Sequence, residues 1–481
     1  MEKIKNFIGG KFLTPISKKY LENYDPAKGE IYSLVPDSDS RDIKTAVDMS
    51  SSVFPFWSNL PLKDRSNYLM KIAHEIEKNL EMLAIAESKD NGKPLWLCKS
   101  VDIPRAASNF KFFASCITQF SSKFYHTSSN VYNYVLKQPI GIAGCISPWN
   151  LPLYLLTWKI APALAAGNCV IAKPSELTPM TAHLLAKICK KIELPDGVLN
   201  IIHGRGENVG EEIVQNKNIP VISFTGGTKT GKKIAVNCAT RMKKFSLELG
   251  GKNPNIIFSD CNFDLALKTT IKSSFSNQGQ ICLCGSRIFI QKKIYKKFVK
   301  EFVKETKKII VGPPSEKKSQ LGALISENHL KKIEYYVDLA KKEGGKILTG
   351  GEKVNLSGKF SKGYYYKPTI IEGLDMNCKV NKEEIFGPVV TVIPFDSEQE
   401  VIFLANQSDY GLSSSIWTEN LTTAHKVSSK LDSGIIWVNS WLLRDLRTPF
   451  GGMKNSGIGR EGGYKSLEFF TETKNVCLNF D

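Results

Sequence analysis

Two cysteines, Cys282 and Cys284, lie one residue apart in a stretch of small and polar residues that runs from Phe275 to Arg287. A thiol beside a glycine-bearing turn can be reached by a substrate and by backbone N–H donors, which a nucleophilic cysteine requires. A free cysteine is also a common small buried residue. Because a single cysteine has little specificity, this stretch alone leaves the nucleophile and the structural thiol open as alternatives.

Glu248 is a second residue that could do chemistry. It stands inside an apolar run that ends in Gly250 and Gly251. A carboxylate in apolar surroundings is either paired with a cation or has a raised pKa. The pattern is therefore compatible with a salt-bridged core carboxylate and with a general base.

The elements that must hold these residues are indicated by alternating strand-like and helical segments. The first set of expected strands covers residues 142–146, 169–172, 198–202 and 221–224, with helices from about residues 153, 178, 207 and 230. A second set covers residues 256–258, 288–290, 369–371, 389–393, 416–418 and 435–438, again with helices between. Such alternation predicts an α/β fold with a parallel, doubly wound sheet and a ligand at the carboxyl ends of its strands.

The residues that follow the strands of the first set are candidates for ligand binding. Thr225, Gly226 and Gly227 open a helix whose free N–H groups suit a phosphate. Lys173 and Glu176 suit ribose hydroxyls, and an acidic residue there favours NAD over NADP. The glycines from Gly204 to Gly210 are a weak dinucleotide fingerprint, because the third glycine falls one position late.

Other segments predict supporting elements. Apolar residues at helical spacing over residues 69–83 predict one amphipathic helix, and residues 99–113 predict another. Residues 151–167 are apolar but interrupted by Pro152, Lys159 and Pro162, so we expect a buried helix there, not a membrane span. Residues 126–137 and the tail 469–481 are strand-like and polar, which is typical of an edge or an inter-subunit ribbon.

Composition places the chain among ordinary globular proteins. Its 481 residues suit about three domain-sized units, with 42% hydrophobic and 23% charged residues. The N-terminal residues have no apolar core of a signal peptide. Eleven scattered cysteines favour a reducing, cytoplasmic location, and no Cys-x-x-Cys pair or histidine cluster suggests a metal site.

The net charge of +18 has a plain interpretation. The lysines are dispersed, many of them as pairs, without a block of five or six and without interleaved aromatic residues. This pattern is typical of a solvated surface and not of a nucleic-acid interface. A positive surface also attracts acidic ligands.

Seven short motifs, taken together, are specific. Through them the chain resembles the aldehyde dehydrogenase superfamily over nearly its whole length. The motifs are Pro148-Trp149-Asn150, Lys173-Pro174-Ser175-Glu176, Phe224-Thr225-Gly226, Leu247-Glu248-Leu249-Gly250-Gly251-Lys252, Asn277-Gln278-Gly279-Gln280 before Cys282, Glu384-Ile385-Phe386-Gly387-Pro388 and Pro449-Phe450-Gly451-Gly452.

The resemblance implies an NAD-dependent enzyme with a Rossmann-type cofactor domain. Cys282 would attack the aldehyde, Asn150 would stabilise the oxyanion, and Glu248 would activate the water that releases the acid. Glu384 would hold the nicotinamide ribose. The implied cofactor-binding residues are Ile146, Pro148, Trp149, Lys173, Ser175, Glu176, Gly206, Gly210, Phe224, Thr225, Gly226, Gly227, Leu249, Glu384 and Phe386. Gly227 departs from the family, which commonly has Ser there.

Within the superfamily, the chain most resembles 2-aminomuconate and 2-hydroxymuconate semialdehyde dehydrogenases. This resemblance lies in residues 102–105, 109–113, 147–159 and 441–447. A substrate with a remote carboxylate needs a fixed cation, and a guanidinium binds a carboxylate through two hydrogen bonds. Arg105 and Arg444 are the candidates, with Arg447 in reserve and Leu156 as a further substrate-binding residue.

Other interpretations stay open at this point. Each arginine could instead form a local ion pair, since Asp102 and Asp445 are close in sequence. A betaine-aldehyde or broad aliphatic aldehyde dehydrogenase is the alternative enzyme. A CoA-acylating dehydrogenase generally lacks the glutamate base. A silent structural or nucleic-acid-binding protein would not need Cys282, Glu248 and Asn150 together.

The resemblance also implies a domain organisation. Residues 1–123 and 142–252 would form the NAD-binding domain, and residues 253–440 the catalytic domain. Residues 124–141 and 465–481 would form an oligomerisation ribbon, and residues 441–464 an active-site loop that returns to the first domain. A homodimer or homotetramer is expected, with no membrane or nucleic-acid partner.

Overall fold

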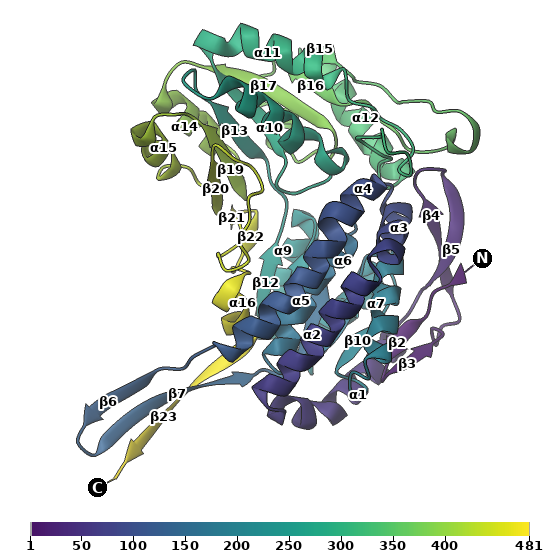
Figure 1. Ribbon diagram of the computed structural model, residues 1–481, viewed down its shortest axis with the longest axis vertical. Coiled ribbons are helices and arrows are strands. Elements are labelled where there is room, and N and C mark those ends of the chain that lie inside the picture. Colours follow the sequence, from purple (N-terminus) through teal and green to yellow (C-terminus); the bar gives the residue numbers. More distant parts are fainter. Residues whose placement is uncertain (1, 481) are drawn as a thin grey trace.

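The computed structural model describes residues 2–480 and contains two large sheets, which Figure 1 shows in the lower and upper parts of the molecule. The first sheet consists, in spatial order, of β22 (Gly457–Ile458), β12 (Lys244–Glu248), β11 (Val221–Thr225), β8 (Ile142–Ile146), β9 (Cys169–Lys173), β10 (Leu199–Ile201), β2 (Asn6–Ile8) and β3 (Lys11–Leu13). The four strands expected between residues 142 and 224 are all present, with ends that differ by at most one residue.

The middle of this sheet is parallel and reverses its order at one point. From β8 the chain adds β9 and β10 on one side, and later β11 and β12 on the other. The loops after β8 and β11 therefore emerge side by side at the carboxyl edge. A reversal of this kind is where doubly wound sheets bind their ligands.

Helices cover the first sheet. Their bounds are α1 (Ser40–Asn59), α2 (Leu62–Lys78), α3 (Leu80–Asn91), α4 (Leu95–Leu97), α5 (Ile103–Thr118), α6 (Pro152–Ala165), α7 (Met180–Lys191), α8 (Glu211–Gln215), α9 (Thr228–Ala239) and α16 (Gly463–Phe469). Of these, α6 is buried at nearly every position, as its apolar sequence predicts. It packs against α5, which in turn packs against α2.

One helix prediction is wrong. The apolar spacing over residues 69–83 suggested a single helix, but two helices, α2 and α3, meet at Asn79. The Asn79 backbone leaves the helical region, and its Nδ2 donates to the Glu75 carbonyl at 2.7 Å. This side-chain bond competes with the helical ladder. The apolar spacing continues across the break because both helices face the same core.

The second sheet consists, in spatial order, of β15 (Lys346–Thr349), β16 (Thr369–Glu372), β17 (Val389–Phe395), β14 (Gly285–Gln291), β13 (Asn253–Ile257), β19 (Ser413–Trp417) and β20 (Ile435–Val438). Its helices are α10 (Phe263–Phe275), α11 (Lys292–Thr306), α12 (Glu327–Lys342), α13 (Lys379–Lys382), α14 (Glu398–Asn406) and α15 (Leu421–Ser428). All strand pairs except β15–β16 are parallel, which confirms the second α/β unit.

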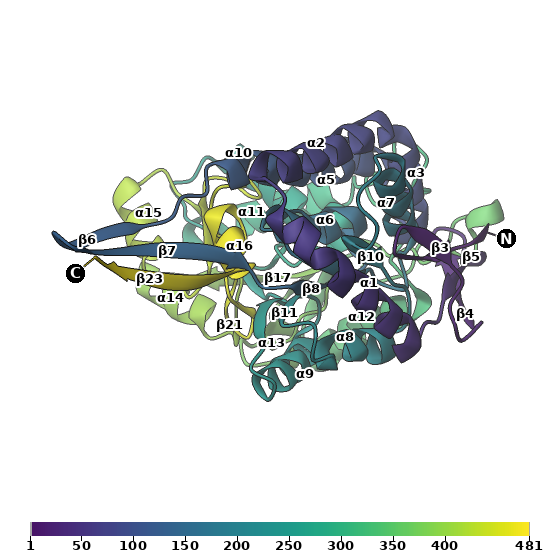
Figure 2. The ribbon, with the colours of Figure 1, turned by 90° about the horizontal axis from the view of Figure 1, so that it is seen from below.

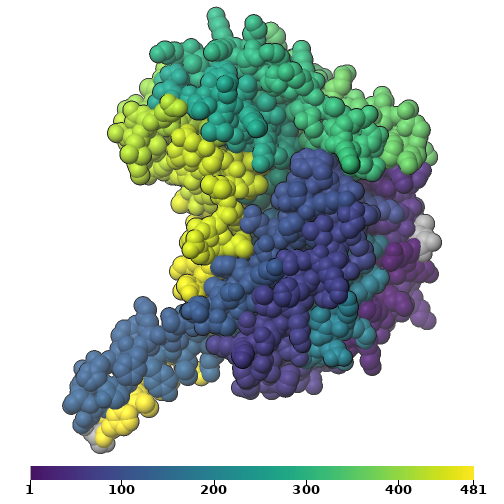
Figure 3. All heavy atoms as spheres, viewed as in Figure 1, coloured from purple at the N-terminus to yellow at the C-terminus, as the bar shows by residue number. Residues whose placement is uncertain are grey.

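A three-stranded ribbon projects from the body. It contains β6 (Phe124–Ser128), β7 (Val131–Pro139) and β23 (Thr471–Asn479), with β7 antiparallel to both neighbours. Figure 2 shows β7 and β23 side by side, and Figure 3 shows the ribbon standing clear of the body. The strand-like character expected for residues 126–137 and for the tail is confirmed, although Asp481 lies outside the described residues.

Smaller strands complete the chain. They are β1 (Glu2–Lys3), β4 (Tyr20–Asp25) and β5 (Glu30–Pro36), which form one sheet, and β18 (Tyr410–Gly411) and β21 (Met453–Lys454), which pair with each other. Within residues 2–480, no helix combines the length and the apolar character that a membrane crossing requires.

Candidate active site

The Cys282 loop lies between α10 and β14 and is held in an unusual backbone conformation. Asn277, Gln278 and Gly279 all have positive φ, at 51°, 56° and 69°. A Cβ at Gly279 would lie 2.1 Å from the Gly387 carbonyl oxygen, so only glycine fits there. Gln278 is anchored at both ends of its amide, to the Ala323 carbonyl and the Gly322 N–H. Three strained residues are thus fixed just before the thiol.

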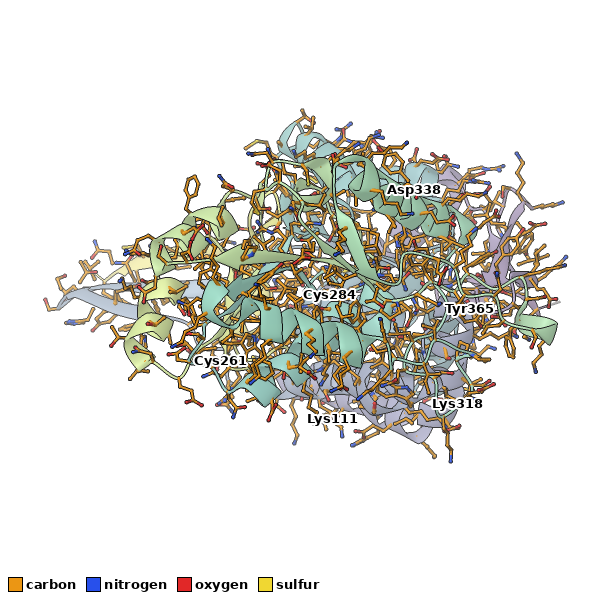
Figure 4. All side chains as sticks on the ribbon, turned by 90° about the horizontal axis from the view of Figure 1, so that it is seen from above. Lys111, Cys261, Cys284, Lys318, Asp338 and Tyr365 are labelled. Carbon is orange, nitrogen blue, oxygen red and sulfur yellow. The ribbon has the colours of Figure 1, made fainter. Side chains whose placement is uncertain are left out.

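Cys284 does not share the exposure of Cys282. Its thiol is buried, and burial raises its pKa to about 12. Figure 4 labels Cys284 near the middle of the molecule, away from surface lysines such as Lys111 and Lys318. The half-buried Cys282 borders a cavity, so it is the thiol of the pair that a substrate can reach.

Asn150 is brought against the Cys282 loop. It ends the loop after β8, and its Nδ2 donates to the Gln280 carbonyl at 2.9 Å. In return, Asn277 Nδ2 donates to the Asn150 carbonyl at 3.0 Å. One amide hydrogen of Asn150 is thereby committed, which fixes the plane of the amide and leaves its second hydrogen for another acceptor. Asn150 and Cys282 line the same cavity.

Glu248 ends β12 and is not the salt-bridged core carboxylate that its sequence allowed. It is 4% exposed, its Oε1 has no hydrogen-bond partner, and it forms no ion pair among residues 2–480. Burial and the nearby Glu461 raise its pKa well above the ordinary value, although the positive charges of Lys159 and Arg444 lower it. Lys159 pairs instead with Glu461, at 2.7 Å. Glu248 can therefore hold and release a proton.

The cavity at Cys282 has a volume of about 260 Å³. The expected cofactor residues that line it are Pro148, Trp149, Thr225, Gly226, Gly227, Leu249, Glu384 and Phe386. They come from the loops after β8 and β11, the end of β12 and a loop of the second unit. The structure thus brings together residues from five of the seven motifs around one space.

The amino end of α9 opens onto this cavity. Gly227 precedes the helix without a side-chain cap, and a Cβ added there would meet nothing within 4 Å. Thr228 Oγ1 is buried without a partner. Gly226 has no such freedom, because a Cβ there would lie 2.4 Å from the Phe224 ring. Free N–H groups at a helix start attract a phosphate.

Lys173 and Glu176 meet farther along the same edge. Lys173 Nζ lies 3.0 Å from Glu176 Oε2, and the Gly206 N–H donates to Glu176 Oε1 at 3.4 Å. Burial raises the pKa of Glu176, but Lys173 and hydrogen bonds from backbone N–H groups together outweigh this effect, and the pKa is lowered. The Lys173 side chain also passes the Gly210 backbone. These residues form one polar group of the kind that ribose hydroxyls require.

Three other expected cofactor residues are mostly buried. Ile146 and Phe224 lie in the core of the first unit, and the Ser175 hydroxyl accepts from the Leu177 N–H. Their side chains shape the edge of the sheet, and the Ser175 hydroxyl can still donate a hydrogen bond to a ligand.

Glu384 and Phe386 are held by α12, through two residues that carry no motif. His329 Nε2 lies 2.7 Å from the Phe386 carbonyl oxygen, and Lys332 Nζ donates to the Glu384 carbonyl at 3.2 Å. Burial lowers the pKa of His329 to about 4, so its Nε2 donates as a neutral imidazole. Both residues line the cavity. Sequence reasoning missed them, and their spacing of three on an amphipathic helix was the only available signal.

Arg444 lies close enough to Cys282 for its positive charge to act on the thiol. In the same loop, Trp441 Nε1 donates to the carbonyl of Leu283, the residue after Cys282, at 2.9 Å. The Arg444 guanidinium stacks on aromatic rings, with Cζ 4.1 Å from the Phe450 centroid and 4.6 Å from that of Trp158. Its Nη1 donates to the Tyr154 hydroxyl, whereas its buried Nη2 has no hydrogen-bond partner.

Glu248 faces the loop that also supplies Phe450. A Cβ at Gly451 would lie 2.9 Å from Glu248 Oε1. Phe450 and Cys282 pack against one apolar cluster. The positive charge of Arg444 lowers the pKa of both Cys282 and Glu248, although other influences leave both raised. The cation, the thiol and the carboxyl group therefore belong to one site.

Neither candidate arginine forms the ion pair that its sequence neighbours allowed. Asp102 pairs with Lys93 at 2.8 Å, and Asp445 pairs with Arg447 at 2.6 Å. Among residues 2–480, no carboxylate lies within 4 Å of Arg105 or Arg444. Arg105, on α5, is half-buried with its Cζ 6.0 Å from the Tyr154 ring centroid.

Two expected substrate residues are not brought to the site. The Arg447 side chain is 81% exposed and engaged by Asp445. Leu156 is fully buried in the core, so the prediction of a substrate contact there is corrected; its neighbour Leu155 lines the cavity instead. Successive helical positions differ by about 100°, and α6 is apolar on every side, so its sequence does not reveal which face meets the cavity.

No group of three or more His, Cys, Asp or Glu side chains in the described part of the chain is arranged to hold a metal ion.

Comparison with known proteins agrees with this site. The sequence model of the aldehyde dehydrogenase family matches residues 12–476. The 2-aminomuconic semialdehyde dehydrogenase of Bos taurus is 50% identical, over 99% of this chain and 98% of its own. The 2-hydroxymuconic semialdehyde dehydrogenase of a Pseudomonas species is 40% identical, over 99% of this chain and 100% of its own.

A solved structure extends the likeness to the fold. The NAD+ complex of an aldehyde dehydrogenase from Bacillus cereus has a TM-score of 0.97 and 38% identity, and the match covers 100% of this chain and 97% of that one. The fold, the thiol site and the sequence agree, and the chain belongs to the aldehyde dehydrogenase family, whose members are oxidoreductases acting on aldehydes.

Proposed function

We propose that this chain oxidises an acidic semialdehyde, 2-aminomuconate 6-semialdehyde or 2-hydroxymuconate semialdehyde, to the carboxylic acid with NAD+. The observation that carries the proposal is Arg444, a guanidinium beside Cys282 whose buried Nη2 has no partner and which no carboxylate of the described chain neutralises. A buried donor left unpaired costs about 1–3 kcal/mol, and more when it is charged. A substrate carboxylate would remove that cost and bind through the guanidinium fork.

The relatives support this substrate class. Proteins of Bos taurus and of Pseudomonas that resemble the chain over almost its whole length carry the names of 2-aminomuconic and 2-hydroxymuconic semialdehyde dehydrogenases. Arg105 would add a second positive charge near Tyr154. The amino or hydroxyl substituent makes no predicted contact, so both muconates stay within the proposal.

The proposed reaction gives one role each to Cys282, Asn150 and Glu248. The Cys282 sulfur adds to the aldehyde carbon, and the Asn150 amide hydrogen and the Cys282 N–H receive the oxyanion. Collapse of the oxyanion re-forms the carbonyl, expels a hydride from the former aldehyde carbon and leaves a thioester on Cys282. Bound NAD+ would supply the acceptor for that hydride. Glu248 takes a proton from water, which attacks the thioester and releases the acid and the thiol.

The residues present fit NAD+. The uncapped start of α9 suits the diphosphate. Glu384, whose Oε1 accepts the Gly251 N–H at 2.9 Å, would hold the nicotinamide ribose. Glu176 would accept hydrogen bonds from the adenosine ribose, and its negative charge disfavours a 2′-phosphate, so NAD+ is preferred over NADP+.

Wider features of the protein belong to the same proposal. Residues 1–123 with 142–252 would bind NAD+, residues 253–440 would carry the nucleophile, and residues 441–464 would form the substrate loop. The ribbon of residues 124–141 and 465–481 would join subunits into a homodimer or homotetramer. Eleven cysteines suit a reducing cytoplasm.

A betaine-aldehyde dehydrogenase is the alternative, and the aromatic residues argue against it. Rings arranged as a cage bind quaternary ammonium groups. Here Phe450, Trp158 and Tyr154 surround the guanidinium of Arg444 instead. A cationic substrate would meet a like charge at this place.

The test is NADH formation from enzymatically generated 2-hydroxymuconate and 2-aminomuconate semialdehydes, beside betaine aldehyde and hexanal. We expect kcat/KM for a muconate semialdehyde to exceed that for the other two by at least about 30-fold, since a buried charge pair contributes about 2–5 kcal/mol. Cys282→Ala should abolish all four activities. Equal turnover of hexanal or betaine aldehyde would refute the substrate class and leave the family intact.

A further inference from the structure

Tyr154 bonds to one of the two arginines and presents its ring to both. It lies on α6, four residues after Asn150, and is 8% exposed. Its hydroxyl accepts a hydrogen bond from Arg444 Nη1. Its ring centroid lies 5.8 Å from the Arg444 Cζ and 6.0 Å from the Arg105 Cζ. One side chain thus contacts two cations that come from distant parts of the sequence.

The backbone of Tyr154 is held as well. Asn109 Nδ2, one turn after Arg105 on α5, donates to the Tyr154 carbonyl at 3.0 Å and to Thr157 Oγ1 at 3.0 Å. Thr157 Oγ1 donates to the same carbonyl at 3.0 Å. The ring is therefore fixed relative to α5, which carries Arg105, and relative to the oxyanion residue at the start of α6.

Two positive charges beside one ring require an interaction that offsets their mutual repulsion. Guanidinium groups repel each other, and neither has a carboxylate within 4 Å among residues 2–480. The aromatic face attracts both cations. The phenol oxygen, by accepting from Nη1, sets the rotation of the Arg444 plane, and the remaining Nη2 is left unpaired. Removing the oxygen would free that plane while the ring stays in place.

We propose that Tyr154 is a positioning residue that presents Arg444 and Arg105 to the remote carboxylate of the substrate and thereby sets the preference for acidic over neutral aldehydes. The proposal rests on the proposed function, since it assumes that this carboxylate binds at Arg444. In this proposal the phenol oxygen acts only by bonding to Arg444, and Tyr154 contacts neither the thiol nor the carbon that reacts.

Tyr154→Phe tests the proposal, because it deletes the oxygen and keeps the ring. With 2-hydroxymuconate semialdehyde, we expect kcat/KM to fall about 10-fold, mainly through KM, as loss of a hydrogen bond to a charged group implies. With hexanal, kcat/KM should stay within about twofold, which also verifies that the variant folds. Tyr295→Phe is the matched control. Tyr295 lies on α11, and its hydroxyl donates to Glu372 at 2.8 Å, so deleting that hydroxyl should change neither value.

A double-variant cycle separates positioning from packing. If the hydroxyl acts through Arg444, Tyr154→Phe should cost nothing further in an Arg444→Ala background. An additive loss, or an equal loss for hexanal, would show that Tyr154 only packs α6 and would overturn the proposal. An unchanged substrate ratio in Tyr154→Phe would overturn it too. If the unaltered enzyme shows no preference for the acidic aldehyde, the proposed substrate class has failed instead, and this is measured first.

Discussion

At the scale of residues, the proposed chemistry depends on two acidic groups, the half-buried Cys282 thiol and the buried Glu248 carboxyl group. Burial raises the pKa of the Cys282 thiol, and the charges of Glu384 and Glu248 raise it further. Burial and Glu461 likewise raise the pKa of Glu248. The thiol must lose its proton to attack, and the carboxyl group must be ionised to take one from water. Both raised pKa values therefore reduce the fraction of the active, deprotonated form of each group at a given pH.

The pH dependence of the rate follows from these shifts. Because the active forms are deprotonated and both pKa values are raised, kcat/KM should increase from pH 6 to pH 9, by up to about 10-fold per pH unit where one proton governs the rate. Steady-state NADH formation in buffers of constant ionic strength measures this. A rate that is flat with pH, or that falls above pH 7, would disagree with the assigned roles.

Glu248→Gln, which cannot take a proton, should lower kcat by about 10²–10⁴-fold.

The sequence predicts the residues that lie in motifs and misses those that do not. Cys282, Asn150 and Glu248 are recognisable because each stands at a strand end or a glycine-rich turn. His329 and Lys332 are not, because on the amphipathic α12 they look like ordinary solvent-facing residues. The sequence also does not reveal the free Nη2 of Arg444. Asp102 and Asp445 are close to the candidate arginines in sequence, and only the structure shows that they pair with Lys93 and Arg447 instead.

At the scale of elements, a buried ion cluster ties the site's helices together. Lys93 Nζ lies 2.8 Å from Asp102 and 3.4 Å from Glu87. Glu87 also accepts the Leu153 N–H at 3.2 Å, at the start of α6. Asp102 precedes α5 directly. The cluster thus fastens α3 to the helix starts beside Asn150 and Arg105.

Removing the cation should therefore cost both stability and rate. In Lys93→Met two buried carboxylates lose their counter-charge, which destabilises by about 3–5 kcal/mol. We expect the temperature of half-inactivation to fall by several degrees and the rate with hexanal to drop, as Asn150 shifts. Lys111→Met is the control, because it breaks an exposed pair with Glu77 worth about 0–1 kcal/mol. Equal behaviour of the two variants would show that the cluster does not hold the helices.

Strands were easier to predict than helix ends. The buried parallel strands are short apolar runs, and β8 begins and ends where its sequence indicated. The break between α2 and α3 was missed because apolar spacing reports which face is buried and not whether the backbone continues. The break lies at Asn79, whose backbone leaves the helical region while its side chain bonds to the Glu75 carbonyl.

At the scale of the whole molecule, the ribbon remains without a partner in the single chain. Phe124 and Phe480 are each 62% exposed, and both pack against Tyr132. Among the described strands, β6 and β23 each pair with β7 alone and form the edges of the ribbon, and edge strands favour pairing with another chain. Two polar strand-like segments predicted the ribbon, but the pairing of residues 131–139 with the tail needed the structure.

Assembly through the ribbon can be tested by charge. Phe124→Glu with Phe480→Glu should reduce the particle from a multiple of the 53.6 kDa subunit to a single subunit, because charges replace apolar surface. Light scattering after size exclusion measures the mass. Phe403→Glu alters an equally exposed phenylalanine on α14 and should leave the assembly intact. A mass unchanged in the double variant would exclude the ribbon as the interface.

The central claim is that Arg444 selects an acidic aldehyde, and one measurement tests it most directly. It is the ratio of kcat/KM for 2-hydroxymuconate semialdehyde to that for hexanal, in the unaltered enzyme, Arg444→Ala and Arg447→Ala. The ratio cancels any common effect on the Cys282 thiol, whose pKa Arg444 also lowers. We predict a fall of about 100-fold in Arg444→Ala and no change in Arg447→Ala, whose side chain faces solvent. An unchanged ratio in Arg444→Ala would contradict the account.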